Sequence, residues 1–488
     1  MTSLKQKTYH SFAWDFAGKI SNQIVGFGIS IILARLLMPE DFGLLAMVNV
    51  FIGVSAIFMD MGLSSSLVQQ KRLRPIHYNS VFYFNLAVAA FLTLLLFFSA
   101  PLIAAYYKRQ ELLLLTQVLS FSFIINSLTT VQYAYLKKRM EFSKFTKYSI
   151  SSGVISGLLG VILAYHGFGV WALVWQSLLG SVIYAILIWV FSHWKPELSF
   201  SFKALKQLWG YGFRMFLSGI LESIYTRVDV LIIGRLFPAD ILGYFQRAKS
   251  LDQLVVTYSS SSLMQVLFPV LSSIQHDLTR FKEVVTKAYN YLNIVVFFIL
   301  GWLYLGAEDL ISILFSDKWL PAVPYFKILV LSSFVYPLSA LLVNVLSSRG
   351  NSKAFLKLEI IKKIVFTGCF PVFFYYGIMG YLWAFVFAAF FALLANIYFV
   401  KREINISFFK YLKTLGLYIF ISSILVIIIR LLLPLEGHKL HFIIASTLYT
   451  SAYVGIVFGF KLEGSMFLLD EVKKISVIQK TVNYFSKG

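Results

Sequence analysis

Long apolar stretches separated by short polar or Gly/Pro-containing breaks make up most of the chain. A bilayer core about 30 Å thick is crossed by roughly 20 apolar residues of helix, so each such stretch predicts a membrane-spanning helix. Backbone groups in hydrocarbon must be hydrogen-bonded within their own segment, which favours helices. The pattern predicts about fourteen spans, near residues 11–37, 41–66, 78–107, 112–136, 148–165, 170–192, 209–237, 241–270, 288–306, 323–346, 358–376, 380–400, 414–433 and 440–460.

The composition excludes a water-soluble protein. Of the 488 residues, 59% are hydrophobic and 13% are charged, whereas soluble domains carry about 25% charged residues. The mean hydropathy is +0.77. The one cysteine, Cys369, lies in an apolar run and has no partner for an internal disulfide. No Cys/His set has the spacing of a zinc site, and we expect no metal or cofactor.

The net charge of +21 first suggests a polyanionic partner such as nucleic acid. The distribution of the charge gives another explanation. Of the 43 Lys and Arg residues, 28 lie in the loops on one side of the predicted spans, four on the other side and eleven within spans. Because cytoplasmic loops are enriched in Lys and Arg, this asymmetry predicts that both termini are cytoplasmic. Nucleic acid is therefore not an expected partner, whereas membrane lipids are.

The two halves of the chain resemble each other. ARL at residues 34–36 corresponds to GRL at residues 234–236, and Gly43 corresponds to Gly243. At an offset near 210, Arg139 corresponds to Arg349. An even number of spans per copy gives parallel repeats, an architecture of secondary transporters. The predicted fold is all-α and polytopic, with a six-helix lobe at 1–205, a second at 206–405, two added spans at 406–460 and a basic amphipathic cytoplasmic tail at 461–488, for which a frayed tail is the alternative.

Several segments carry a family resemblance: ILARLLMPEDFGLLAM from Ile32, DMGLSSSLVQQK from Asp60, GFGVWALVWQSL from Gly167, LGYFQRA from Leu242 and KWLPAVP from Lys318. They resemble the Wzx-type lipopolysaccharide-biosynthesis flippases, close to the WzxC-like branch. These are polysaccharide transporters of the multidrug/oligosaccharidyl-lipid/polysaccharide exporter superfamily. The resemblance extends over about residues 1–460.

The resemblance implies a fold of the MATE type and an activity. The substrate would be an undecaprenyl-pyrophosphate-linked oligosaccharide, moved by alternating access from the cytoplasmic to the periplasmic leaflet of the bacterial inner membrane. A polysaccharide polymerase and chain-length machinery would be candidate partners. The resemblance does not identify the sugar.

Embedded cations are candidates for contact with the pyrophosphate. An ionisable group at the bilayer centre costs about 2.5–3.5 kcal/mol, so a deep one needs a cavity or a partner. Arg forks and Lys ammonium groups suit phosphate oxygens. The deep candidates are Lys19, Arg227, Lys362 and Lys363; Arg214 lies about one turn inside its span, and Arg247 belongs to a family segment.

Each of these cations also has a structural interpretation. Lys19 follows Asp15 by four residues, and the two could neutralise each other within one helix. They share a polar stripe with Asn22 and Gly26 that predicts a wet interior face. Glu359 precedes Lys362 and Lys363 by three and four residues.

Uncharged polar residues are candidates for contact with sugar hydroxyls. Asn126, Gln132 and Gln176 lie inside spans and can each donate and accept hydrogen bonds. Alternatively, such groups bond one another between helices.

Embedded carboxylates raise the question of ion coupling. Glu222 and Asp229 are seven residues apart on nearly one helix face, and Asp15 and Asp60 also lie inside spans. Such a group could carry a proton or bind sodium; a helix-packing ion pair is the alternative. The sequence has no G-x-x-x-x-G-K-[ST] loop, so ATP is not expected as the direct driver.

Two other function classes remain as alternatives. An integral-membrane polymerase or ligase would need a sizeable outer catalytic loop, and the longest predicted outer loop spans only about residues 307–322. A drug exporter of the same superfamily would share the fold, but a surplus of embedded cations disfavours cationic drugs.

Overall fold

The apolar stretches are helical in the computed structural model, which describes residues 4–192, 194–433 and 439–465. The predicted tail lies mostly outside these residues. The side chains of residues 4–16, 211, 214, 215, 218, 221, 255–266, 439 and 440 also lie outside the description. The helices are α1 (Leu4–Leu36), α2 (Pro39–Asp60), α3 (Leu63–Gln69), α4 (Pro75–Tyr107), α5 (Glu111–Ser120), α6 (Ser122–Lys138), α7 (Phe142–Tyr165), α8 (Val170–Phe191), α9 (Phe202–Leu236), α10 (Ala239–Ser273), α11 (Leu278–Leu305), α12 (Ala307–Phe315), the 3₁₀ helix η1 (Asp317–Ala322), α13 (Val323–Ser333), α14 (Val335–Ser348), α15 (Ser352–Thr367), α16 (Val372–Ile404), α17 (Phe408–Leu432) and α18 (Lys439–Gly459).

Eleven helical segments in the described part of the chain are long and apolar enough to cross a membrane. The chain is therefore an all-helical, multi-pass membrane protein. The predicted number of fourteen spans is not confirmed. The three further predicted spans coincide with α9, α10 and α15; of these, α15 has only 16 residues, and its lysines lower its hydropathy.

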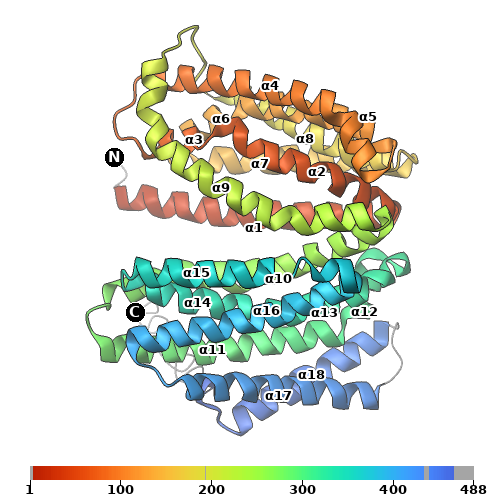
Figure 1. The fold of residues 1–488 in the computed structure, drawn as a ribbon, viewed down its shortest axis with the longest axis vertical. Coiled ribbons are helices and arrows are strands. Elements are labelled where there is room, and N and C mark those ends of the chain that lie inside the picture. Colours follow the sequence, from red (N-terminus) through yellow and green to blue (C-terminus); the bar gives the residue numbers. More distant parts are fainter. Residues whose placement is uncertain (1–3, 193, 434–438, 466–488) are drawn as a thin grey trace, which may run out of the picture. The chain divides into compact units, whose positions relative to one another are not determined.

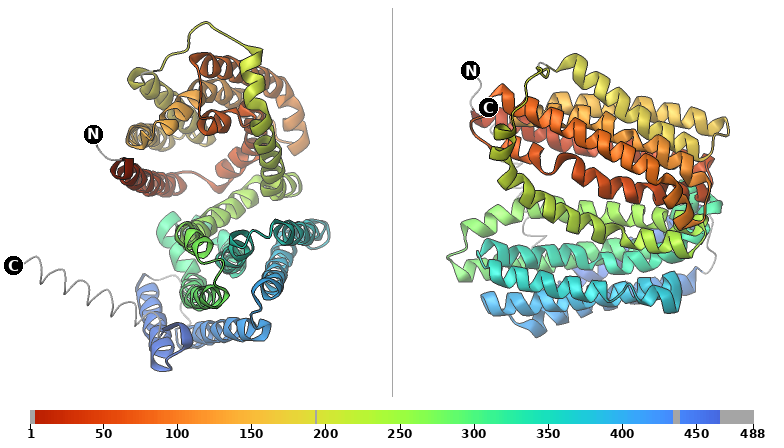
Figure 2. Two further views of the ribbon diagram at one scale, coloured as in Figure 1. Left: turned by 90° about the vertical axis from the view of Figure 1, so that its left-hand side faces the viewer. Right: turned by 45° about the horizontal axis from the view of Figure 1, so that its top comes forward.

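The chain divides into two compact units, residues 1–246 (unit 1) and 247–488 (unit 2). Within unit 1, α7 packs against both α1 and α8, α4 packs against α5 and α6, and α2 packs against α9. Within unit 2, α11 packs against α14 and α17, and α16 packs against α13, α14 and α15. The helices of each unit form a bundle (Figures 1 and 2). The lobe bounds inferred from the sequence, 1–205 and 206–405, stay predictions.

The basic loops of unit 1 meet at one end of its bundle, here called the basic end. The Lys138 Nζ donates to the carbonyl of Leu67 at 2.9 Å and also to that of Gln70, which joins the end of α6 to the end of α3. The Asn79 Nδ2 donates to the Ser199 Oγ at 2.7 Å, which joins α4 to the segment before α9. The alternation of basic and non-basic loops therefore follows the two ends of unit 1. The side of the membrane that the basic end faces stays a prediction.

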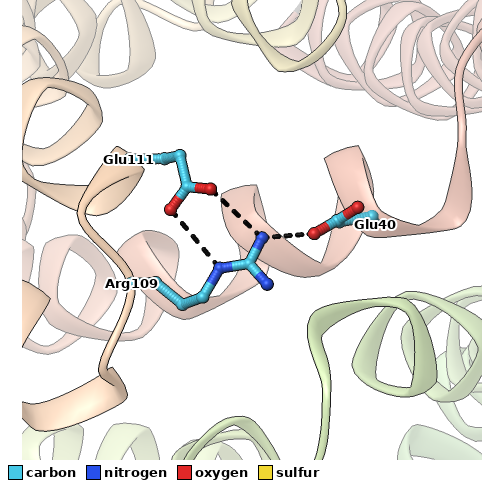
Figure 3. Close-up of polar contacts among 3 residues, drawn as sticks. All are labelled: Glu40, Arg109 and Glu111. Carbon is cyan, nitrogen blue, oxygen red and sulfur yellow. Dashed lines mark hydrogen bonds and ion pairs between the residues drawn. The ribbon is translucent and has the colours of Figure 1, made fainter.

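Arg109 ties together the opposite end of unit 1. Its guanidinium donates to Glu40 at the start of α2 and, at 3.4 Å, to both carboxylate oxygens of Glu111 at the start of α5 (Figure 3). The hydrogen bond to Glu40 is the main reason why the pKa of Arg109 is raised, and the charge of Glu111 adds to this effect. Carboxylates are also favourable at helix N-termini. This interaction fixes the α4–α5 turn to α2.

The backbone repeats the duplication seen in the sequence. Residues 139–141 and 349–351 form the same turn after α6 and α14: the middle residue has a positive φ of 59° and 74° respectively. The last amide of each turn donates back across the helix end, to Leu136 at 3.0 Å and to Leu346 at 3.1 Å. This is the Schellman pattern of hydrogen bonds at a helix C-terminus. An offset of 210 residues in sequence therefore corresponds to a repeated turn.

A glycine conformation is repeated as well. Gly169 before α8 has φ 53° and ψ −133°, and Gly377 inside α16 has φ 62° and ψ −161°. This region of backbone conformations is essentially restricted to glycine. The two glycines lie close to the 210-residue offset that relates Arg139 to Arg349, and each redirects the chain between two helical stretches.

Two glycines 200 residues apart form a close crossing within unit 1. A Cβ on Gly43 would overlap the carbonyl oxygen of Ala239, and a Cβ on Gly243 would overlap the carbonyl oxygen of Pro39. Pro39 and Ala239 are themselves 200 residues apart, so the first turns of α2 and α10 meet in a pseudo-symmetric way. Only glycine allows the two backbones to approach this closely.

In unit 2, hydroxyl groups of α17 and α18 attach these two C-terminal spans to α11. The hydroxyl of Tyr449 donates to the Phe297 carbonyl at 3.0 Å, and that of Tyr453 donates to the Ile294 carbonyl at 2.9 Å. Ser422 on α17 donates to the same Phe297 carbonyl at 3.1 Å. Since Tyr449 and Tyr453 are four residues apart, both project from one face of α18. Buried hydrogen bonds of this kind fix α17 and α18 on unit 2.

The glycine crossing predicts an unusual sensitivity to a single methyl group. Gly43→Ala and Gly243→Ala should each destabilise the protein by about 1–3 kcal/mol, because backbone rather than a flexible side chain blocks the new Cβ. Gly28→Ala is the matched control, since no atom lies within 4 Å of its Cβ position. Thermal unfolding of the purified protein measures the difference. Equal melting temperatures in all three variants would contradict the close crossing.

Candidate functional site

A cavity of about 730 Å³ lies inside unit 1 among α1, α2, α6, α7 and α8. Its walls combine small, hydroxyl, amide and aromatic side chains, and the described residues that line it include no Asp, Glu, Lys, Arg or His. The lining polar and aromatic residues are Asn22, Asn126, Thr129, Thr130, Tyr133, Phe145, Ser149, Ser152, Ser156, Gln176, Ser177, Ser181 and Tyr184. A site with this chemistry suits an uncharged polar ligand.

Small residues on α7 and α8 create the space for the cavity. Ser149, Ser152, Gly153 and Ser156 follow a spacing of i, i+3, i+4 and i+7, so they occupy one face of α7. A Cβ on Gly180 of α8 would lie 3.0 Å from the Ser156 Oγ. Close approach of the two helices at these positions leaves their polar faces directed at the cavity.

Some polar groups of the lining are paired within the protein. The Ser149 Oγ donates to the Asn22 Oδ1 at 3.1 Å and thereby links α7 to α1. Ser152 donates to the carbonyl of Ser149 at 3.0 Å, as serines in helices commonly do. Thr129 and Thr130 each donate to the carbonyl of Asn126 at 2.9 Å.

Other polar groups of the lining have no hydrogen-bond partner among the described residues. They are the side-chain amides of Asn126 and Gln176 and the hydroxyls of Ser177, Ser181 and Tyr184. Four of these five residues come from α8. Ser177 and Ser181 are four residues apart, and Gln176 and Tyr184 are eight residues apart, so all four lie on neighbouring parts of one helix surface. Of these groups only the Tyr184 hydroxyl is buried; Asn126 and Ser177 are exposed, and Gln176 and Ser181 are half-buried. The four accessible groups can therefore bond water or a polar ligand.

Aromatic rings form one part of the cavity wall. The ring centroids of Tyr133 and Phe145 are 4.8 Å apart, and those of Phe145 and Tyr184 are 6.2 Å apart with an edge-to-face angle of 83°. These contacts join α6, α7 and α8. The cavity thus presents apolar ring surface beside hydrogen-bonding groups.

Two of the predicted pathway residues, Asn22 and Asn126, line this cavity together. The predicted wet stripe on α1 is only partly reproduced: Asn22 and Gly26 line the cavity, whereas Lys19 is exposed and does not. Gln176 also lines the cavity, but Gln132 is fully buried elsewhere and bonds Ser192 at 2.5 Å and the Trp194 carbonyl at 3.0 Å. Asp15 and Arg214 have side chains outside the described residues.

Arg227 occupies a distinct position in unit 1. Its guanidinium lies over Gly53 of α2, where any Cβ would collide with it. Its Nε donates to the Ser223 Oγ at 3.2 Å, and that hydroxyl donates to the Gly53 carbonyl at 3.3 Å. Arg227 is half-buried and forms no ion pair with any described side chain. The remaining donors of its guanidinium can therefore bind an anion.

The predicted cations of the second half have other surroundings in unit 2. Arg247 is buried, with its guanidinium 4.8 Å from the ring centre of Phe315 and 5.1 Å from that of Trp319. Lys362 forms an ion pair with Glu359 at 2.5 Å, as its structural interpretation expected. Lys363 is exposed.

The predicted coupling carboxylates whose side chains the structure describes are Asp60, Glu222 and Asp229, and their surroundings differ. Asp60 accepts hydrogen bonds from the amide and hydroxyl of Ser64 and, at 3.2 Å, from the Asn85 Nδ2, so it holds the α2–α3 corner. Asp229 is buried, whereas Glu222 is exposed on the same helix. Their role in coupling stays a prediction.

The hydroxyl residues of α7 and α8 were not among the sequence candidates. Their spacing was a usable signal, since Ser149, Ser152 and Ser156 repeat at one face of the fifth predicted span. Polar residues at helical spacing identified Asn22 on the first span, and the same criterion applied to the fifth span identifies the serine face of α7.

Known proteins share both the sequence and the fold of the chain. Residues 32–324 match the family described as polysaccharide biosynthesis protein. The succinoglycan biosynthesis transport protein ExoT of Rhizobium meliloti (strain 1021) is 26% identical over 357 residues, which cover 73% of this chain and 72% of ExoT. The lipopolysaccharide biosynthesis protein WzxC of Escherichia coli (strain K12) is 22% identical over 372 residues, which cover 75% and 74%.

Among solved structures, the lipid II flippase MurJ in its inward closed conformation has the same fold. Its TM-score is 0.75 at 18% identity, and the match covers 94% of this chain and 99% of MurJ. The predicted fold class and the resemblance to Wzx-type transporters are thereby confirmed. The chain belongs to the polysaccharide biosynthesis protein family.

Proposed function

We propose that the protein is a flippase that moves an undecaprenyl-pyrophosphate-linked oligosaccharide from the cytoplasmic to the periplasmic leaflet of a bacterial inner membrane. Its relatives ExoT and WzxC are named for the transport or biosynthesis of cell-surface polysaccharides, and MurJ is named as a flippase of lipid II. The observation that carries the proposal is the polar, uncharged cavity inside a bundle of membrane-spanning helices. In this proposal both termini are cytoplasmic, and a polysaccharide polymerase is a candidate partner.

The chemistry of the substrate explains why such a cavity is needed. Each sugar hydroxyl that leaves water without a new partner costs roughly 2–7 kcal/mol, so an oligosaccharide does not cross hydrocarbon unaided. A cavity with amide and hydroxyl groups replaces the water that the sugar loses. The polyprenyl chain, in contrast, can stay in the lipid throughout.

The pyrophosphate requires cations rather than hydroxyls. Arg227 is the candidate best supported by the geometry, because no described carboxylate neutralises it. Lys362 is already paired with Glu359. Lys19, Arg214 and Lys363 stay candidates. Arg247 has a structural role in this proposal, because its guanidinium lies against the rings of Phe315 and Trp319.

An integral-membrane polymerase or ligase is less well supported. The relatives named above are described as transport, biosynthesis or flippase proteins, and the segment predicted as the longest outer loop forms α12 and η1, which pack against α13. A drug exporter of the same superfamily is disfavoured by the hydrogen-bonding lining of the cavity.

Transfer in reconstituted vesicles tests the proposal. The wild-type protein should move a fluorescent undecaprenyl-pyrophosphate-linked oligosaccharide between leaflets faster than lipid alone. Arg227→Ala should slow transfer about tenfold or more, because one charge-assisted contact is lost. Arg227→Lys should transfer at an intermediate rate, since lysine keeps the positive charge but lacks the paired N–H donors of the guanidinium. Lys19→Ala should also slow transfer.

Arg430→Ala is the matched control for the loss of an embedded cation. Arg430 lies 5.6 Å from the ring centre of Tyr304 in unit 2, and its loss should leave transfer nearly unchanged. Equal rates in all these variants would show that the embedded cations are structural. Absence of transfer by the wild-type protein under an imposed proton or sodium gradient would refute the proposed function.

Cysteine labelling tests whether the cavity meets water. In a Cys369→Ser background, Asn126→Cys and Ser181→Cys should react with a small, membrane-impermeant thiol reagent in intact vesicles. Phe98→Cys is the control on a lipid-exposed face of α4, where Phe98 is 73% exposed, and it should react slowly. Equal protection of all three positions would contradict a hydrated cavity.

A further inference from the structure

We propose that the cavity of unit 1 is a binding subsite for an uncharged sugar ring of the transported saccharide. This inference rests on the proposed function and specifies what the cavity recognises. The pyrophosphate would be bound elsewhere, at cationic side chains such as Arg227.

The absence of charge in the lining sets the class of ligand. None of the lining residues in the described part of the chain is acidic, basic or histidine. An anion moved from water into this cavity would lose its hydration without gaining a counter-charge, which is strongly unfavourable. A neutral sugar loses only hydroxyl–water hydrogen bonds, which the cavity can replace.

The free polar groups match the hydrogen-bonding pattern of a sugar. Gln176 and Asn126 each offer donors and an acceptor, and the hydroxyls of Ser177, Ser181 and Tyr184 can do either. A sugar hydroxyl likewise donates and accepts. These five residues have no hydrogen-bond partner among the described residues, so binding breaks no existing side-chain hydrogen bond.

The aromatic wall suits the other surface of a sugar ring. The C–H groups of a pyranose form an apolar face that packs well against the electron-rich face of an aromatic ring. Tyr133, Phe145 and Tyr184 supply such rings next to the polar groups of α8. The cavity therefore combines both surfaces that a pyranose presents.

The size of the cavity limits what it holds. A volume of about 730 Å³ falls in the range of small-molecule sites, about 300–1,000 Å³. It accommodates a mono- or disaccharide portion, and the rest of a lipid-linked repeat unit would extend out of its open side.

Ordinary helix packing does not explain these polar groups. Where polar side chains hold the helices of unit 1 together, they bond one another: Gln132 accepts from Ser192 and donates to the Trp194 carbonyl. Gln176 lines the cavity and has no side-chain hydrogen bond to any residue that the structure describes. The contrast between the two glutamines separates a structural role from a ligand-binding role.

Saturation-transfer-difference NMR on the full chain in lipid nanodiscs tests the subsite directly. The probes are methyl β-D-glucopyranoside, N-acetylglucosamine and glucuronate. At least one of the two neutral sugars should receive saturation from the protein, and glucuronate should receive several-fold less. Gln176→Leu should weaken binding of the neutral sugar about three- to tenfold.

Tyr184→Phe and Ser181→Ala provide milder tests, because each removes one oxygen and keeps the fold intact. Each should weaken binding about two- to fivefold. Gln23→Leu is the matched control, since Gln23 adjoins Asn22 on α1 but does not line the cavity; it should leave binding unchanged.

The outcomes separate the subsite from the proposed function. Normal transfer of the lipid-linked saccharide without saturation of any neutral sugar would overturn the subsite and leave the flippase function standing. Unchanged binding in both Gln176→Leu and Tyr184→Phe, or preferential binding of glucuronate, would also overturn it. Sugar binding that these variants weaken, with no transfer by the wild type, would support the subsite and refute the proposed function.

Discussion

A polar group inside a membrane-spanning helix must have a partner, and the structure follows from this constraint. Hydrocarbon supplies no hydrogen bonds, so backbone groups are satisfied within helices and polar side chains across them. Asp60 accepts hydrogen bonds from Ser64 and Asn85. Gln132 accepts one from Ser192 and donates one to the carbonyl of Trp194. In unit 2, Tyr449 and Tyr453 of α18 donate hydrogen bonds to backbone carbonyls of α11. Against this background, a cluster of polar groups without partners in the described residues stands out as a site that meets water or a ligand.

Hydropathy predicts the helices well because the same constraint acts on every span. It does not predict where a span breaks. The fourth span of each half is interrupted, at Phe121 between α5 and α6 and at Phe334 between α13 and α14. Both phenylalanines keep a helical backbone conformation. Pro337, in the first turn of α14, cannot donate a hydrogen bond to Ser333, the last residue of α13, and so accounts for the second break. Neither α5 nor α6 contains a glycine or proline, so tertiary packing determines the first break. Gly43 and Gly243, in contrast, were visible as a repeated pair, but their meaning depended on the backbone that each one meets.

The candidate site was only partly predictable for a related reason. Asn22 and Asn126 were predicted, and they line one cavity. Lys19 belonged to the same stripe on α1, yet the cavity face of this helix begins one turn later, at Asn22. The serines of α7 gave a weak signal, because a helical serine often satisfies itself on its own backbone, as Ser152 does. Whether such a residue faces a cavity or a neighbouring helix depends on how the helices pack.

Helix α2 connects the two parts of the proposed recognition. Gly53 of α2 lies beneath the guanidinium of Arg227, and Leu45 of α2 lines the uncharged cavity. Eight residues of helix separate these positions along α2, or roughly 12 Å. An anionic pyrophosphate and an uncharged sugar need opposite environments, because a counter-charge stabilises the first and contributes little to the second. One rigid helix that borders both environments holds them at a fixed spacing. If the proposed recognition holds, substitutions in the cavity would change the sugar that is bound and leave the contact with the pyrophosphate at Arg227 unchanged.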